Sequence, residues 1–105
     1  MTERLQRLLN FLEASPGDSF LLFAVAKEYE KEKDIKMALQ YYIQLKTSDP
    51  DYVGLYYHLG KLYEQKEDFD TAVATYQTGM EVAKKQGDKH ALSELAGAKL
   101  NLVDE

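Results

Sequence analysis

The sequence predicts an all-α fold made of antiparallel helix hairpins, and three observations support this prediction. Apolar residues recur at helical spacing throughout the 105 residues, and no stretch shows the alternation typical of a strand. The segments between the helical stretches are only a few residues long, so consecutive helices should be antiparallel neighbours. One pattern of residues also occurs twice, first in residues 16–49 and again in residues 50–83. A repeat at a fixed period indicates stacked copies of one structural unit.

The first half of the chain is expected to form three helices, at about residues 2–13, 19–33 and 35–47. Leucines spaced three and four residues apart give the first helix one apolar face, and Pro16 ends it because proline lacks the amide N–H that would continue the helix. Asp18 or Ser19 can cap the second helix. The charged residues at its end are expected to be solvated, namely Glu28, Glu30, Lys31, Glu32 and Lys33. A short turn at Asp34 leads into the third helix.

The second half repeats this arrangement, with helices expected at about residues 53–66, 69–86 and 89–103. The fifth helix should run longer than the third, because Lys84 stands where Pro50 ends the earlier unit and nothing stops the helix before Gly87. Asp88 can cap the last helix. Gly97 lies inside that helix at a cost of about 1 kcal/mol relative to alanine, and a close backbone contact would explain its presence.

The composition is that of an ordinary globular domain. The chain has 18 acidic and 13 basic residues and a net charge of −5, and no basic patch indicates nucleic-acid binding. It contains no cysteine, which excludes disulfides and thiolate metal sites. Polar residues interrupt the N-terminal leucines, and no stretch approaches the roughly 20 apolar residues of a membrane helix. We expect a cytoplasmic protein that binds neither nucleic acid nor membranes.

Residues 16–49 and 50–83 align with identical residues at packing and turn positions. The identical pairs are Pro16/Pro50, Leu21/Leu55, Lys27/Lys61, Tyr29/Tyr63, Glu30/Glu64, Asp34/Asp68, Ala38/Ala72 and Tyr42/Tyr76. Ala26 and Gly60 are small, which indicates that the two helices of each hairpin cross closely there. The paired tyrosines are expected to fill the wider space between successive hairpins, with hydroxyls free to reach an edge.

This pattern resembles the tetratricopeptide repeat family, in which an aromatic residue, Leu-Gly, Tyr, Ala, an aromatic residue and Pro follow one another within each repeat unit. The second unit matches with Tyr56, Leu59, Gly60, Tyr63, Ala72 and Tyr76, and lacks the closing proline. The first unit has Leu22 at the aromatic position and otherwise matches with Val25, Ala26, Tyr29, Ala38, Tyr42 and Pro50.

The resemblance implies a right-handed α-α superhelix of six helices. It also implies a single domain over residues 1–105, whose parts are an N-terminal half-repeat helix at 1–15, repeats at 19–50 and 53–86, and a C-terminal capping helix at 88–105. In such arrays the outer half units cover the ends of the stack.

No arrangement of residues indicates catalysis, a metal site or a cofactor. His58 and His90 are the only histidines, and neither has a second ligand at metal-binding spacing. The acidic segments 49–51 and 68–70 lack the glycine turn and distal glutamate of a calcium loop, and are interpreted as helix starts. We therefore expect no enzyme activity, no catalytic residue and no cofactor.

The resemblance also implies that the first helices of the hairpins line a concave groove for a peptide or a partner helix. The predicted groove residues are Phe20, Phe23, Lys27, Tyr57, His58 and Lys61, with Lys31, Gln65, His90, Ser93 and Gly97 beside them. Large apolar residues that the hairpin core does not use often mark interaction sites. The alternative is that the phenylalanines pack beneath the first helix and that Tyr57 covers its neighbours.

Lys27 and Lys61 stand one repeat apart, which favours an acidic peptide or a C-terminal carboxylate as the ligand. The alternative is that the two lysines pair with Glu30 and Glu64, and such surface pairs contribute little to stability.

Some members of the family grip the C-terminal carboxylate of chaperones with lysine, asparagine and arginine residues. Here Phe23 stands at the expected lysine, Lys27 and His58 at asparagines, and Glu94 at the arginine. A mixed aromatic and basic groove is therefore expected instead.

Two functions remain open on the sequence. The first is an adaptor or scaffold that binds a peptide or helical segment of a partner protein. The second is structural self-association as a homodimer through the terminal half repeats, because Leu5, Leu9 and Phe11 cannot all point into one thin array of helices.

Overall fold

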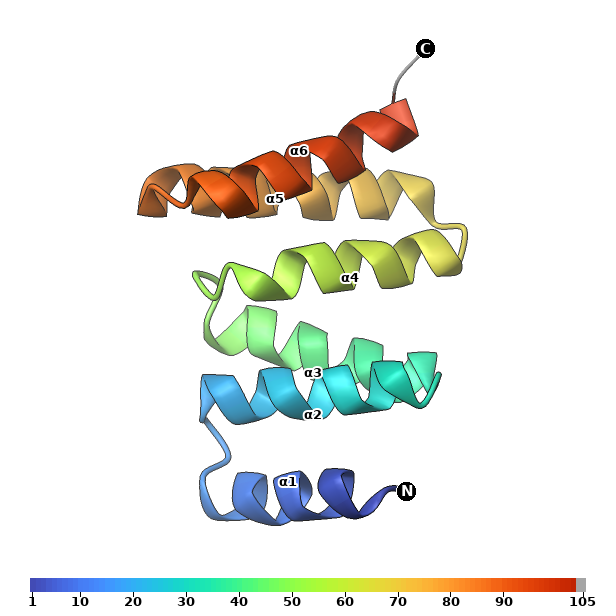
Figure 1. The fold of residues 1–105 in the computed structure, drawn as a ribbon, viewed down its shortest axis with the longest axis vertical. Coiled ribbons are helices and arrows are strands. Elements are labelled where there is room, and N and C mark those ends of the chain that lie inside the picture. The colour runs from blue at the N-terminus through green and yellow to red at the C-terminus, as the bar shows by residue number, and fades with distance from the viewer. Residues whose placement is uncertain (104–105) are drawn as a thin grey trace. The chain divides into compact units, whose positions relative to one another are not determined.

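The computed structural model describes residues 1–103, which form six α-helices and no strand within that range (Figure 1). The helices are α1 (Glu3–Ala14), α2 (Ser19–Lys31), α3 (Ile35–Ser48), α4 (Gly54–Gln65), α5 (Phe69–Gln86) and α6 (Lys89–Val103). The all-α prediction is confirmed, and the expected helix ends differ from the observed ones by two residues or fewer. The part of the predicted capping segment at residues 104–105 lies outside the described residues.

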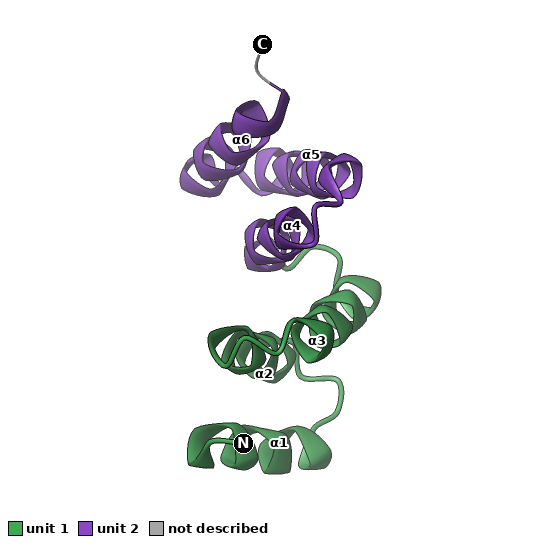
Figure 2. Ribbon diagram, turned by 90° about the vertical axis from the view of Figure 1, so that its right-hand side faces the viewer, with its two compact units in different colours: residues 1–52 green, residues 53–105 purple. Residues whose placement is uncertain are grey.

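The chain divides into two compact units, residues 1–52 and residues 53–105 (Figure 2). Unit 1 contains α1, α2 and α3, and unit 2 contains α4, α5 and α6. Each unit therefore holds one complete helix hairpin and one further helix. The single domain over residues 1–105 stays a prediction.

In unit 1 the α2–α3 hairpin forms the core, and α1 packs against α2. The apolar residues with the least exposure are Leu5, Leu22, Val25, Ala26, Ala38, Tyr42 and Leu45. The apolar face of α1 is only partly covered. Leu5 is completely buried, Leu9 is half-buried, and Phe11 is 60% exposed.

In unit 2 the helix α5 packs against both α4 and α6. A Cβ atom added to Gly60 of α4 would come within 2.7 Å of Cδ1 and Cζ of Tyr76. This close approach confirms the crossing that the small residue predicted. A Cβ atom on Gly79 would lie 2.5 Å from Cβ of Tyr56 and 3.0 Å from Cδ1 of Leu95, so α5 also approaches its neighbours closely at a glycine that the sequence pattern did not single out.

An aspartate begins four of the helices by accepting a hydrogen bond from the backbone N–H three residues later. These aspartates are Asp18, Asp34, Asp68 and Asp88. The turns just before Asp34, Asp68 and Asp88 share one geometry, in which a residue with positive φ precedes the aspartate and the N–H of that aspartate bonds a carbonyl five residues back. Such a Schellman ending satisfies the last carbonyl groups of a helix.

The residue with positive φ is Gly87 in one of these turns, with φ of 71°. In the other two it is Lys33 at 63° and Glu67 at 61°, in equivalent places of the two hairpins. The sequence predicted the ending at Gly87. It did not predict left-handed backbone at a lysine and a glutamate, because these residues rarely adopt it.

Two expectations about individual residues were wrong. The hydroxyl groups of Tyr42 and Tyr76 are not free, since both side chains are completely buried and donate hydrogen bonds to Glu30, at 2.7 Å, and to Glu64. A hydroxyl removed from water needs such a partner. Gly97 is not explained by a close contact, because a Cβ atom there would meet nothing within 4 Å.

Candidate partner-binding site

On α2, the residues Phe20, Phe23 and Lys27 follow one another at spacings of three and four and form what we term the α2 patch. Phe20 is 65% exposed, and Lys27 is also exposed. Phe23 is half-buried, with its ring centroid 6.1 Å from that of Tyr42 and 5.1 Å from that of Tyr52. The Nζ atom of Lys27 lies 5.4 Å from the Phe23 centroid, within the range of a cation–π interaction.

On α4, the residues Tyr57, His58 and Lys61 form the α4 patch, and all three are half-buried. The ring centroid of Tyr57 lies 6.0 Å from that of His58 and 6.5 Å from that of Tyr76. The Nζ atom of Lys61 lies 5.5 Å from the Tyr57 centroid and 3.7 Å from Oε2 of Glu64. The ammonium group of Lys61 is thus shared between an aromatic ring and a carboxylate.

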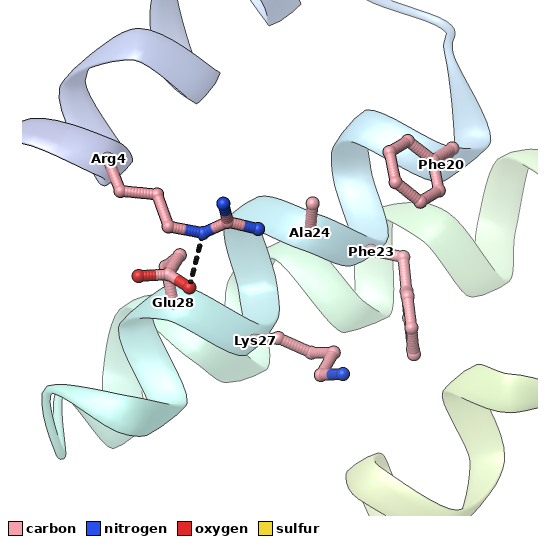
Figure 3. Close-up of a pocket in the computed structure, with 6 residues that line it drawn as sticks. All are labelled: Arg4, Phe20, Phe23, Ala24, Lys27 and Glu28. Carbon is pink, nitrogen blue, oxygen red and sulfur yellow. Dashed lines mark hydrogen bonds and ion pairs between the residues drawn. The ribbon is translucent and has the colours of Figure 1, made fainter.

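A cavity of about 150 Å³ lies between α1 and α2 (Figure 3). It is lined by Arg4, Phe20, Phe23, Ala24, Lys27 and Glu28. The Nε atom of Arg4 donates to Oε2 of Glu28 at 3.0 Å. The Glu28 side chain is only 12% exposed, whereas that of Arg4 is 62% exposed.

This cavity corrects one expectation and adds one residue to the site. Glu28 was expected in the solvated end of its helix, but it is buried, and the Arg4 guanidinium compensates its charge. Sequence reasoning missed Arg4 as a site residue. Its position beside Leu5, in the first turn of α1, carries no signal until α1 is seen packed on α2.

The tyrosines behind the two patches are held in the protonated form. The pKa values of Tyr42 and Tyr76 are both raised well above the ordinary value. Burial is the larger cause, and the hydrogen bond to a glutamate is the second. Phe23 and Tyr57 therefore lie against uncharged, hydrogen-bonded rings.

Residues 1–103 contain no group of three or more histidine, aspartate or glutamate side chains that could hold a metal ion. Within the same range, no helix is both long and apolar enough to cross a membrane.

The tetratricopeptide repeat model matches this chain twice, at residues 21–52 and 53–86. The chain belongs to the tetratricopeptide repeat family. Proteins of this family are typically interaction modules without enzymatic activity, and they bind other proteins. The second matched range contains the α4–α5 hairpin, and the first covers the α2–α3 hairpin from residue 21 onwards.

Solved structures of tetratricopeptide repeat proteins resemble this one. A crystal structure of a tetratricopeptide repeat domain protein from Salinibacter ruber is 47% identical, covers 81% of this chain and 94% of that chain, and has a TM-score of 0.78. A solution structure of a tetratricopeptide repeat domain protein from the same organism is 46% identical, covers 84% of this chain and 89% of that chain, and has a TM-score of 0.80.

A more distant likeness shows the fold alone. The solution structure of a protein from Bordetella parapertussis is 24% identical, covers 97% of this chain and 89% of that chain, and has a TM-score of 0.83. A comparison with curated proteins gave no match.

The structure places the six predicted groove residues on the first helices of the two tetratricopeptide repeats, three in each unit. Phe23 packs on Tyr42 and Tyr52, so it is neither a core residue nor fully open. The other residues expected beside the groove are exposed, namely Lys31, Gln65, His90, Ser93 and Gly97. A binding role for any of them stays a prediction.

The two lysines differ in their surroundings. Lys61 makes the ion pair with Glu64 that the alternative interpretation expected. Lys27 has no such pair among the described residues and lies over the Phe23 ring instead.

Proposed function

We propose that this tetratricopeptide repeat protein is an adaptor that binds a peptide or helical segment of another protein through the α2 patch and the α4 patch. One observation carries the proposal, namely that the same aromatic–lysine pair occurs in both repeats. Phe23 with Lys27 and Tyr57 with Lys61 stand at equivalent positions of the two repeats, with Nζ-to-ring distances of 5.4 Å and 5.5 Å.

The packing of each ring suits it to serve as an anchor. Phe23 lies against Tyr42, and Tyr57 lies against Tyr76, so a tyrosine of the second helix of each hairpin supports the ring. A side chain that is already ordered loses little conformational entropy when a partner covers it. Aromatic anchors of this kind are enriched among the residues that dominate binding energies.

The lysines add a preference for acidic partners. An exposed cation–π contact contributes only about 0.5–1 kcal/mol, so an ammonium group can move off the ring and meet a carboxylate of the partner at little cost. Opposite charge on a partner also accelerates encounter and disfavours basic competitors. The expected ligand is therefore an acidic segment that also carries apolar side chains.

The experiment compares two charge-reversal variants of equal net charge in a pull-down from host lysate, read by mass spectrometry. Lys27→Glu/Lys61→Glu alters both patches, whereas Lys36→Glu/Lys89→Glu reverses two exposed lysines at the first turns of α3 and α6. Glutamate suits a first turn, so the control should fold at least as well as the wild type. We expect a protein that the wild type and the control capture and the patch variant loses. Equal capture by both variants contradicts the proposal.

A second function, self-association through the terminal helices, is favoured by exposed apolar residues. Phe11 of α1 is 60% exposed, and Leu100 and Val103 of α6 are 58% and 43% exposed. Burial of such residues against a second copy would remove apolar surface from water. Multi-angle light scattering at rising concentration would then show a dimer that Phe11→Lys/Leu100→Lys dissociates, and a monomer at all concentrations rules this function out.

A further inference from the structure

We propose that the cavity between α1 and α2 binds an acidic side chain of a partner protein, with an adjoining large apolar side chain of the same segment contacting Phe20. This inference rests on the proposed function, because it specifies the chemistry of the segment that binds at the α2 patch. It also assigns a binding role to Arg4, which lies outside both matched repeats.

Arg4 of α1 is held in position by a hydrogen bond to α2. Its Nε atom donates to Glu28, whose side chain is buried on α2 and therefore has few alternative positions. The two terminal amino groups of the guanidinium have no hydrogen-bond partner within residues 1–103. Figure 3 shows them directed away from Glu28, on the side of Ala24. A planar fork with two free donors suits a carboxylate, which can accept both at once.

The charges around the cavity leave a positive excess. Arg4 and Lys27 contribute two cations, and the only carboxylate among the lining residues, Glu28, is already bonded by Arg4. This excess occurs on a chain whose net charge is −5, so it is a local feature and not a property of the whole surface. Electrostatic complementarity therefore selects an anionic occupant.

The remaining lining is apolar and partly open to solvent. Phe20 is 65% exposed, and Ala24 and Phe23 add apolar surface beside it. The cavity measures about 150 Å³, and a cavity of that volume is large enough for a benzene-sized group. This space admits one side chain rather than a helix, and a free carboxylate alone would leave Phe20 uncovered. The occupant is therefore an aspartate or glutamate next to a large apolar residue in a protein segment.

The test selects a phage-displayed library of random peptides, which carry no free C-terminal carboxylate, against the immobilised full chain. We expect enrichment of sequences in which Asp or Glu adjoins Leu, Phe or Met. One enriched peptide is then synthesised with blocked ends, and its dissociation constant is measured by fluorescence anisotropy. Replacement of its acidic residue by the matching amide should weaken binding about tenfold or more, the scale of a lost charged hydrogen bond.

The decisive variants lie on α1. Arg4→Gln should weaken binding to the same extent, and the loss should not add to that of the amide peptide, because both changes remove one interaction. Arg7→Gln is the matched control, because Arg7 is on the same helix and does not line the cavity. Its side chain is 64% exposed, and its Nη1 atom lies 3.8 Å from Oε1 of Glu3, so it too takes part in an ion pair. Arg4→Gln alone leaves the buried carboxylate of Glu28 without its cation, which could itself disturb the cavity. Arg4→Gln/Glu28→Gln replaces both charged groups by neutral ones, so weak binding by this double variant as well shows that the loss comes from the missing guanidinium.

Three outcomes overturn the inference. The first is enrichment of peptides without acidic residues, and the second is the absence of any enriched sequence. The third is a selected acidic peptide that binds Arg4→Gln as tightly as wild type. If that peptide is nevertheless weakened by Lys27→Glu/Lys61→Glu, the proposed function stands and only the role of Arg4 fails.

Discussion

Two glycines inside helices of unit 2 should respond in opposite ways to the same substitution. Gly97 of α6 has nothing within 4 Å of an added Cβ atom. A Cβ atom added at Gly60 of α4 would come within 2.7 Å of two ring atoms of Tyr76. Tyr76 is completely buried and hydrogen-bonded to Glu64. We therefore expect Gly97→Ala to stabilise the protein and Gly60→Ala to destabilise it.

The magnitudes follow from two terms. Alanine is favoured over glycine in a helix interior by about 1 kcal/mol, and this gain applies to both sites. Overpacking a buried site costs about 1–3 kcal/mol, and this cost applies to Gly60 alone. The propensity term cancels between the variants, so the difference between their free energies of unfolding measures the packing cost of about 1–3 kcal/mol.

Thermal and urea unfolding followed by circular dichroism measure this difference. Both glycines lie in unit 2, so the comparison holds even if the two units unfold separately. A change of about 1 kcal/mol should shift Tm by roughly 4–8 °C in a chain of this size. Gly79→Ala extends the series, because the atom it meets at 2.5 Å is the Cβ of Tyr56, which cannot rotate away. Equal stability of Gly60→Ala and Gly97→Ala would refute the reasoning.

Three further predictions concern the hairpins. Lys33→Gly should raise the free energy of unfolding by about 0.5–1 kcal/mol in urea titrations, because glycine adopts the positive φ of 63° without strain. A lower free energy of unfolding would show that the lysine is not strained at this position. Asp34→Ala should lower it by about 1 kcal/mol by removing the cap on Met37, and an unchanged urea midpoint would contradict this. Stability should fall as pH rises above about 10, because the pKa values of Tyr42 and Tyr76 are raised in the folded state and the unfolded chain releases these protons first. Below that pH the contribution is fully present, and Tyr42→Phe should reduce the alkaline fall in the urea midpoint, whereas an equally steep fall would oppose the assignment.

Much of the candidate site could be predicted from the spacing of residues along one helix. Phe20, Phe23 and Lys27 share a face because a helix places residues three and four apart together, and the structure brings them together on α2. The support of Phe23 by Tyr42 and Tyr52 could not be predicted in this way. Those rings come from other segments, and their positions depend on how the hairpin closes.

From the sequence alone we could predict the number and order of the helices, the cap at Asp88 and the resemblance to the family, and the cap of α2 was narrowed to Asp18 or Ser19. Apolar period, proline and glycine positions and N-terminal aspartates act within a few residues, so they can be recognised without knowledge of packing. The recurrence of the pattern of residues 16–49 in residues 50–83 then identified each hairpin as a copy of one unit.

Which polar groups are buried, and which partners they bond, could be seen only in the folded structure. Glu28 is buried because Arg4, 24 residues away, bonds it, and Tyr42 is buried with its hydroxyl on Glu30 of the preceding helix. The left-handed turn at Lys33 is likewise imposed by the hairpin and not by its own preference. These features depend on contacts between separate helices, and a local pattern carries no information about which distant group will compensate a buried charge or hydroxyl.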